Sequence, residues 1–148
     1  MASAPVPEAL LDEAIAQAFA VRERAHAPYS GYHVGAVLIA ADGSMHVGCN
    51  VEVASYGGTV CAERHAVAAM IAAGKSKPYL CVVATHDVRP AMPCGLCRQT
   101  LVEVSDDLEV LAVTQLPSGE RVRQSATLDA LLPFSFRYDP ATKGQPAH

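Results

Sequence analysis

The sequence predicts an α/β fold: a three-layer α/β/α sandwich with helices on both faces of a mixed five-stranded sheet. Segments with a helical repeat of apolar residues alternate with short apolar or β-branched runs along the chain, which is the pattern of a sheet covered by helices. Hydrophobic residues make up 51% of the 148 residues and charged residues 18%, as in ordinary globular domains. A chain of this length is expected to form one domain with a single site.

Nine elements are predicted from local patterns. In chain order they are a helix at 8–25, strands at 33–41 and 44–49, a helix at 61–73, a strand at 79–85, a helix at 94–104, strands at 108–114 and 120–123, and a helix at 127–131. Apolar side chains recur every three or four residues from Leu10 to Phe19, which indicates an amphipathic first helix, and Pro28 lies beyond its end. The Asp42-Gly43 dipeptide is typical of a hairpin turn between the first two strands.

Glycine and proline residues indicate where the later elements begin and end. The alanine-rich helix that opens at Cys61 ends before Gly74, a residue common at helix C-termini. The run at 79–85 is apolar throughout, as in a strand covered on both faces. Pro93 directly precedes the next helix. A turn at 116–119, which contains proline and glycine, joins the last two strands before the final short helix.

Composition and charge exclude several classes of function. With 11 basic and 15 acidic residues the net charge is −4, and no stretch is basic enough to bind long nucleic acid through its phosphates. The uncharged apolar runs are far shorter than the ~20 residues that a membrane helix needs. Acidic residues near the N-terminus, where a signal peptide carries basic ones, predict a cytoplasmic protein. The proline- and alanine-rich ends, 1–7 and 139–148, are expected to be poorly ordered, which leaves a folded unit at about 8–138.

Five cysteines in a cytoplasmic chain indicate metal binding or a reactive thiol rather than a disulfide framework. Cys94 and Cys97 are three residues apart and directly follow Pro93, so both thiols are expected on one face of the first turn of a helix. Cys61 opens the other central helix. Because helix N-termini favour thiolate over thiol, three thiolates are available as ligands for one tetrahedral Zn²⁺.

The remaining cysteines and one glutamate distinguish a structural from a catalytic zinc site. A closed structural site needs four protein ligands, whereas a catalytic site keeps one position for water. Cys81 lies in the middle of an apolar strand and is expected to be a buried small hydrophobe. Cys49 remains an alternative fourth ligand, and with it the protein would be a structural zinc module that binds a protein partner. Glu63, two residues after Cys61, favours catalysis because it places a carboxylate beside the metal.

These residues form a specific motif. It consists of Cys61-Ala62-Glu63 and Pro93-Cys94-Gly95-Leu96-Cys97. The two halves together match the three-cysteine form of the zinc deaminase signature, in which the glutamate is a general acid and base. The chain resembles the small, one-domain, three-cysteine cytidine deaminases over nearly the whole folded unit. The resemblance extends over segments at 28–30, 34–36, 48–52, 61–64, 93–99 and 131–133 and over Tyr56 and Phe136.

The resemblance implies a cytidine deaminase-like fold and hydrolytic deamination of cytidine and deoxycytidine to uridine and deoxyuridine in pyrimidine nucleoside salvage. It also implies one Zn²⁺ per chain and a homotetramer whose active sites are shared between subunits. The roles that it implies by position are proton transfer for Glu63, hydrogen bonds to the ribose 3′-hydroxyl for Asn50 and Glu52, backbone contacts to the pyrimidine for Ala62, contact with a neighbouring subunit's ribose for Tyr56, and stacking on the base across an interface for Phe136.

The charge at the metal gives Arg64 an expected role. Three thiolates carry three negative charges against the two positive charges of Zn²⁺, which opposes the ionisation of bound water. Arg64, next to Glu63, is the nearest cation in the sequence. Hydrogen bonds from its guanidinium to the thiolates would withdraw negative charge from the metal.

Four residues depart from the family pattern. Val53 stands where asparagine is common, His33 where proline is usual, Tyr32 where phenylalanine is usual and His65 where threonine is frequent. Val53 removes a polar group close to the Asn50 and Glu52 pair. The sequence therefore leaves open a deaminase of the same fold that acts on a modified pyrimidine nucleoside or on a nucleoside antibiotic such as blasticidin S, although the retained Asn-x-Glu pair favours cytidine.

Overall fold

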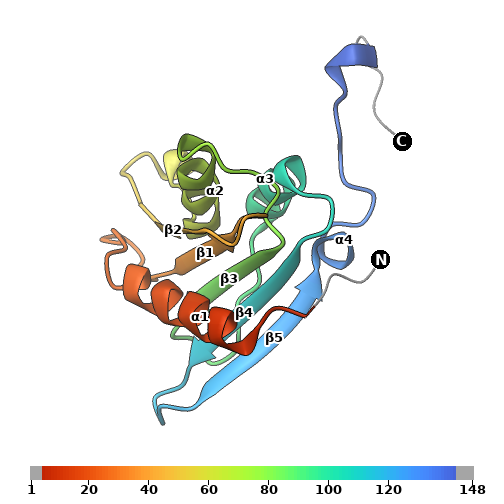
Figure 1. The fold of residues 1–148 in the computed structure, drawn as a ribbon. Coiled ribbons are helices and arrows are strands. Elements are labelled where there is room, and N and C mark those ends of the chain that lie inside the picture. The colour runs from red at the N-terminus through yellow and green to blue at the C-terminus, as the bar shows by residue number, and fades with distance from the viewer. Residues whose placement is uncertain (1–4, 143–148) are drawn as a thin grey trace.

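The computed structural model describes residues 5–142 of the chain (Figure 1). Its elements are α1 Glu8–Arg22, β1 Gly35–Ile39, β2 Met45–Cys49, the 3-10 helix η1 Tyr56–Gly58, α2 Ala62–Ala72, β3 Leu80–Thr85, α3 Gly95–Val104, β4 Glu109–Gln115, β5 Arg121–Thr127, α4 Leu128–Leu131 and the 3-10 helix η2 Pro140–Thr142. The predicted order of helices and strands is therefore confirmed. No helix within this range is long and apolar enough to cross a membrane.

The five strands form one mixed sheet in the order β2-β1-β3-β4-β5. Strands β3 and β4 are parallel, and the other neighbouring pairs are antiparallel. Helix α1 covers one face, whereas α2 and α3 lie on the other (Figure 1). Side chains along β1 alternate between two hydrophobic clusters: Val37 and Ile39 pack with α1, and Ala36 and Leu38 pack with α2. The predicted three-layer sandwich with a mixed five-stranded sheet is confirmed.

Two glycines allow the helices to lie close to the sheet. A Cβ atom on Gly35 would collide with the carbonyl oxygen of Ala18 in α1, and a Cβ atom on Gly48 would collide with the carbonyl oxygen of Ala62 in α2. Any larger residue at either position would push the helix outward. The contact at Gly48 matters most for function, because Ala62 is the first residue of the helix that follows Cys61.

The N-termini of α2 and α3 point into the same region of the molecule. Helix α3 is the crossover between the parallel strands β3 and β4, and it packs against α2 above the sheet. Ala62 and Ala66 of α2 share one hydrophobic cluster with Leu101 and Val102 of α3. The small alanine side chains let the two helices approach closely, so the residues that begin each helix lie next to one another.

Two elements end three or more residues away from the position that the sequence predicts, and the other ends agree within two residues. Helix α1 ends at Arg22 rather than near residue 25, because the last turn tightens: the Ala25 N–H donates to the Arg22 carbonyl at 3.1 Å. Strand β5 continues to Thr127 instead of ending at residue 123, since its polar residues still pair with β4. The sequence predicts poor order at 1–7 and 139–148. Residues 1–4 and 143–148 of these two ends lie outside the described residues.

Candidate active site

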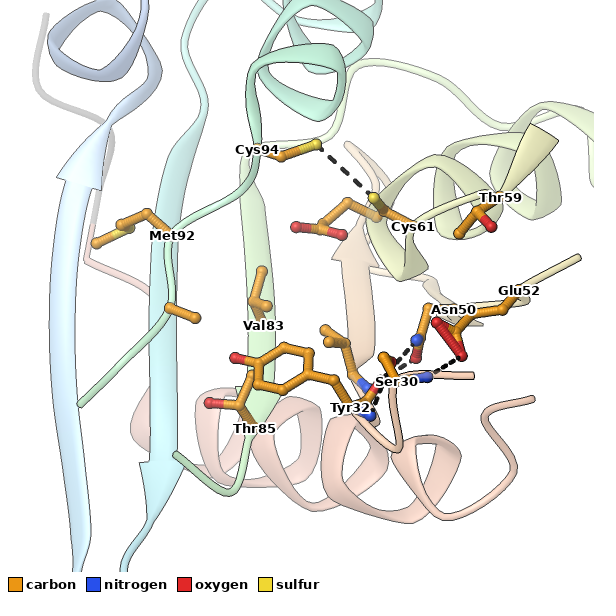
Figure 2. Close-up of a pocket in the computed structure, with 13 residues that line it drawn as sticks. Ser30, Tyr32, Asn50, Glu52, Thr59, Cys61, Val83, Thr85, Met92 and Cys94 are labelled. Carbon is orange, nitrogen blue, oxygen red and sulfur yellow. Dashed lines mark hydrogen bonds between the residues drawn. The ribbon is translucent and has the colours of Figure 1, made fainter. Parts of the chain in front are cut away.

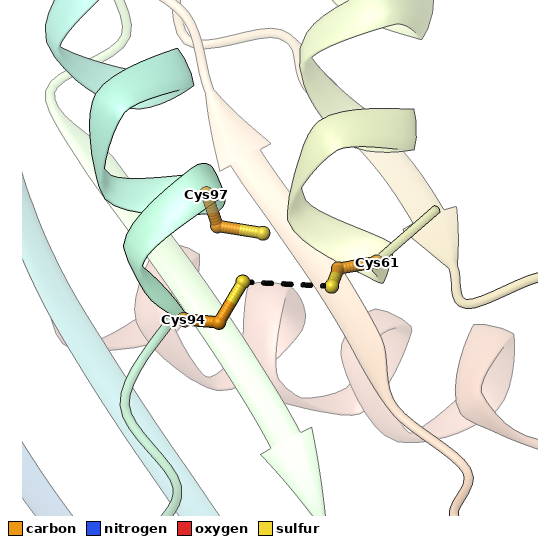
Figure 3. A group of neighbouring side chains, drawn as sticks. All are labelled: Cys61, Cys94 and Cys97. Atoms are coloured by element: carbon orange, nitrogen blue, oxygen red, sulfur yellow. Dashed lines mark hydrogen bonds between the residues drawn. The ribbon is translucent and has the colours of Figure 1, made fainter. Parts of the chain in front are cut away.

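Three cysteine thiols lie together at the N-termini of α2 and α3 (Figure 3). Cys61 and Cys94 are the N-cap residues of the two helices, and Cys97 lies in the first turn of α3. Their sulfur atoms all lie within 4.8 Å of one another, and the Cys61 and Cys94 sulfurs are 3.7 Å apart. Tetrahedral Zn²⁺ with Zn–S bonds of about 2.3 Å requires sulfurs about 3.8 Å apart. The donor set and its spacing therefore fit one zinc ion.

The thiols differ in how readily they lose a proton. A hydrogen bond from Cys97 is the main cause that lowers the pKa of Cys61 to about 5, against the effect of burial, and Cys94 and Arg64 lower it further. The same hydrogen bond, together with burial, raises the pKa of Cys97. The cluster thus presents a ready thiolate at Cys61, and a divalent metal would displace the protons of its neighbours on binding.

The other two cysteines lie outside this cluster. Cys81 is fully buried in β3, and burial holds the pKa of its thiol well above the usual value, in agreement with its expected role as a small hydrophobe. Cys49, the alternative fourth ligand, ends β2 and is not part of the group of metal-binding side chains found among residues 5–142. Three protein ligands, with room for a fourth of another kind, are the donor set of a catalytic zinc site.

Glu63 is buried beside the thiols. Only 4% of this residue is exposed, and its Oε2 atom accepts a hydrogen bond from the Cys97 thiol at 3.6 Å. Burial is the main cause that raises the pKa of its carboxyl, and the negative charge of Cys61 adds to it. The raised pKa makes this carboxyl group a better proton acceptor than an exposed glutamate, as a general acid and base requires.

Arg64 is the cation next to the cluster. Its Nη2 atom donates to the Thr59 carbonyl at 2.9 Å, which orients the guanidinium. Burial is the largest single influence and opposes the charge on Arg64, but the hydrogen bonds and negative charges of Cys61 and Cys97 together outweigh it and raise the pKa of the guanidinium. The buried Nε atom has no hydrogen-bond partner among the described residues. Arg64 therefore lies where its positive charge faces the negative charge of the cysteines.

A pocket of about 350 Å³ extends from the cysteines along β3 (Figure 2). Its lining residues are Ser30, Tyr32, Val34, Asn50, Glu52, Thr59, Cys61, Glu63, Val83, Thr85, Ala91, Met92 and Cys94. Cys61 and Cys94 lie at one end, and Tyr32, Ser30 and Thr85 lie at the other (Figure 2). The pocket is thus reactive at one end and lined by polar loop residues at the other.

Asn50 and Glu52 hold the loop that leads into β1. The Asn50 side chain donates to the Tyr32 carbonyl at 2.7 Å and accepts from the Val34 N–H at 2.8 Å. Glu52 Oε1 accepts from the N–H groups of Tyr29 and Ser30 at 3.2 and 3.1 Å. The Ser30 backbone hydrogen bond is the main cause that lowers the pKa of Glu52. Both side chains also line the pocket, and the hydrogen bonds that Glu52 accepts from the two backbone N–H groups both fall on Oε1.

The remaining predicted site residues do not line this pocket. Ala62 is completely buried at the start of α2. Tyr56 is 71% exposed in η1 and makes an edge-on ring contact with Tyr29 at 5.4 Å. Phe136 is 65% exposed in the C-terminal segment, which extends away from the sheet (Figure 1). Within this chain, therefore, Tyr56 and Phe136 are not brought to the pocket that Cys61 and Glu63 line.

Sequence reasoning missed the β3 side of the pocket. Val83 and Thr85 line it because alternate residues of a strand face the same side. The same alternation, counted from Cys81, was a usable signal for both. Ala91 and Met92 belong to the loop between β3 and α3, and no local pattern marks them.

Comparisons with known proteins agree on one family. Residues 9–113 match the family described as the cytidine and deoxycytidylate deaminase zinc-binding region. A protein named cytidine deaminase from Sporosarcina psychrophila is 37% identical over 85% of this chain and 90% of that protein. Another from Halalkalibacterium halodurans is 39% identical over 82% and 90%. The crystal structure of cytidine deaminase from Burkholderia pseudomallei has a TM-score of 0.76 and 40% identity over 84% of this chain and 98% of that one.

We predict that the purified protein contains one zinc ion per chain, since residues 5–142 offer three clustered thiols and no fourth ligand beside them. Metal analysis gives the stoichiometry, and X-ray absorption spectroscopy should show three sulfur neighbours and one oxygen. Cys94→Ala should lose most of the zinc, whereas the matched variant Cys49→Ala should retain it. Two zinc ions per chain, or four sulfur neighbours, would contradict the three-cysteine site.

Proposed function

The chain belongs to the family of cytidine and deoxycytidylate deaminases, and we propose that it hydrolyses cytidine and deoxycytidine to uridine and deoxyuridine with release of ammonia. The observation that carries this proposal is the buried Glu63 carboxyl, in contact with one of three clustered thiols at the end of a pocket. The names of relatives at 37% and 39% identity support cytidine as the substrate.

Metal binding and proton transfer are divided between neighbouring residues. Cys61, Cys94 and Cys97 would hold the zinc ion, which when bound supplies Lewis-acid activation of water. Glu63 takes one proton from the attacking water and delivers it to N3 of the pyrimidine as the water oxygen bonds to C4. It then passes the second proton to the amino group, which leaves as ammonia. The burial that raises the pKa of Glu63 suits a group that must be protonated and deprotonated in turn.

Arg64 is proposed to keep the metal ligands from becoming too negative. Its guanidinium lies beside Cys61 and is oriented by the Thr59 carbonyl. Charge-assisted hydrogen bonds to thiolates draw electron density away from sulfur. The metal would then remain a stronger Lewis acid than three unshielded thiolates would allow.

The opposite end of the pocket is proposed to hold the sugar. Glu52 accepts both backbone N–H groups on Oε1, and its lowered pKa keeps it negatively charged, so Oε2 is able to accept a hydrogen bond from the ribose 3′-hydroxyl. Asn50 uses one N–H and one lone pair on the backbone at Tyr32 and Val34. The second N–H and the second lone pair remain for the substrate. Ala62 would contribute backbone groups to the pyrimidine from the start of α2.

Glu63→Gln should fold and retain zinc but lose at least about 10²- to 10⁴-fold in kcat, because an amide cannot shuttle a proton. The decrease of ultraviolet absorbance on deamination of cytidine measures kcat, and metal analysis measures zinc. Glu103→Gln, at an exposed glutamate of α3, is the matched control and should behave as the parent protein. A normal kcat for Glu63→Gln would reject the assignment.

Glu52→Ala should reduce kcat/KM for cytidine by about 10- to 150-fold, since a hydrogen bond to a charged group contributes roughly 1.5–3 kcal/mol. Glu52→Gln should lose less, because its amide oxygen still accepts the Tyr29 and Ser30 N–H groups. Free cytosine should be a poor substrate of every variant.

The same assay with 5-methylcytidine and blasticidin S tests the alternative substrates. Faster turnover of blasticidin S than of cytidine would replace the proposed substrate. Unchanged cytidine kinetics in Glu52→Ala would remove the sugar contact from the proposal while leaving the zinc site intact.

A homotetramer with shared active sites is proposed from exposed apolar surface. Phe134, Phe136 and Tyr138 are exposed in the extended C-terminal segment, and Ile71 is exposed on α2. The outer face of α2 also exposes Ala68, Ala69 and Ala72. Surfaces of this kind are typical of subunit interfaces. Phe136 would reach the base bound by a neighbouring subunit, and Tyr56 the neighbouring ribose.

Subunit mixing tests this arrangement. Glu63→Gln and Phe136→Ala should each be weakly active alone. Hybrid oligomers of the two should be several-fold more active than the sum of the parents, because an intact Phe136 then meets an intact Glu63. A mixture of Glu63→Gln with Cys94→Ala is the control and should gain nothing. Additive activities, or a monomer in sedimentation analysis, would contradict shared sites.

The proposed enzyme acts in the cytoplasm, in pyrimidine nucleoside salvage. All five cysteines are free in the structure, and thiolate ligands persist most readily in a reducing compartment.

A further inference from the structure

A hydrogen bond joins two loops at the end of the pocket that lies away from the cysteines (Figure 2). The Tyr32 hydroxyl donates to Asp87 Oδ2 at 3.1 Å. Tyr32 lies in the loop between α1 and β1, and Asp87 lies in the loop between β3 and α3. Tyr32 itself lines the pocket, as do Ala91 and Met92 farther along the second loop. The bond therefore joins two walls of the same pocket.

Asp87 is a fixed anchor for this bond. Its Oδ1 atom accepts from the Val88 N–H at 2.7 Å, and its own N–H donates to the Thr114 hydroxyl at 2.8 Å. The same hydroxyl lies 2.8 Å from the Asp87 carbonyl, to which it donates. Thr114 is completely buried in β4. Asp87 is thus attached to the sheet through its backbone, while one carboxylate oxygen remains for Tyr32.

Tyr32 is held equally firmly from the other side. Asn50 donates to its carbonyl at 2.7 Å, and its N–H donates to the Ser30 hydroxyl at 3.0 Å. A continuous series of hydrogen bonds therefore leads from Asn50 through Tyr32 and Asp87 to Thr114. It connects the end of β2 with β4 by way of two loops that lie 55 residues apart in sequence.

The hydroxyl of Thr85 is a neutral group near the Tyr32 hydroxyl, which bonds to Asp87 instead. Thr85 is 1% exposed, lines the pocket, and its hydroxyl has no hydrogen-bond partner among the described residues. Burial is the main cause that raises the pKa of Tyr32, and Asp87 adds to it. Thr85 is close enough to lower this pKa in part. Tyr32 therefore remains a donor, and a carboxylate is a stronger acceptor than a neutral hydroxyl.

We propose that Tyr32 is a positioning residue of the active site, whose hydroxyl, held by Asp87, fixes the loop before Cys94 and sets the width of the pocket at the nucleoside-binding end. The role in nucleoside binding rests on the proposed function. Without the bond, the Ala91 and Met92 wall and the Tyr32 wall move independently, and the pocket is open part of the time. The thiols keep their places, because Cys94 and Cys97 belong to α3 itself.

Hydrogen exchange tests the effect of the Tyr32–Asp87 hydrogen bond on the two loops without any substrate. In the zinc-loaded protein, Tyr32→Phe and Asp87→Ala should each speed exchange at the amides of both loops, in particular those of Val34 and Asp87, which are hydrogen-bonded in the intact structure. Tyr79→Phe removes a hydroxyl at the far end of β3 and should change neither loop. Unchanged exchange in both variants would show that the Tyr32–Asp87 bond does not hold the loops together, whether or not the protein deaminates cytidine.

Kinetics test the consequence for the site. Tyr32→Phe and Asp87→Ala should each raise KM for cytidine by about 3- to 30-fold. This is less than the roughly 10- to 150-fold effect of losing a direct hydrogen bond to a charged group, because the Tyr32–Asp87 bond is exposed and acts on the substrate only through the two loops. The kcat and the zinc content should stay within about 2-fold of the parent values. The double variant should be no worse than the more affected single variant, because both changes break one interaction.

Three results would overturn the positioning role. They are an unchanged KM in both single variants, additive effects in the double variant, and a loss confined to kcat with reduced zinc. If the parent protein does not act on cytidine, the proposed function fails. The exchange experiment still decides whether the Tyr32–Asp87 bond holds the loops together.

Discussion

The close approach of two helix N-termini is the constraint on which the site depends. Cys61 and Cys94 cap α2 and α3, so their thiols meet only if the helices converge above the sheet. Gly48 permits this on the side of α2, because any side chain there would displace the helix. On the side of α3, the crossover between parallel strands determines its position. The metal ligands are therefore positioned by the hydrophobic core rather than by flexible loops.

The same convergence creates an electrostatic problem that the site solves locally. Thiolates and the Glu63 carboxyl share a buried volume, and like charges there raise the pKa of one another's groups. The hydrogen bond from Cys97 is the main cause that lowers the pKa of Cys61, and the hydrogen bond and positive charge of Arg64 lower it further. Glu63 receives less of this compensation, because its burial is nearly complete. The pKa of the Cys61 thiol is thus lowered, which favours the thiolate, whereas the pKa of the Glu63 carboxyl is raised, which favours its protonated form.

The parts that were predictable from sequence are those encoded locally. Helical spacing, the Asp42-Gly43 turn and the cysteine motif each lie within a few residues, and they correctly gave the element order and the three clustered thiols. The extent of β5 was not predictable, because its pairing with β4 rather than its polar sequence holds it in the sheet. The bond between Tyr32 and Asp87 likewise joins loops that no local pattern relates.

The two ends of the pocket are stabilised by different interactions. The reactive end of the pocket rests on helices whose cores bury many apolar groups at once. The substrate end rests on a few hydrogen bonds between loops, made by Asn50, Glu52 and Tyr32, each contributing only about 0.5–3 kcal/mol. Replacement of one loop side chain therefore changes the shape of the substrate end while the metal ligands keep their geometry. It follows that the core sets the geometry of the thiol cluster, whereas the loops set the shape of the other end of the pocket.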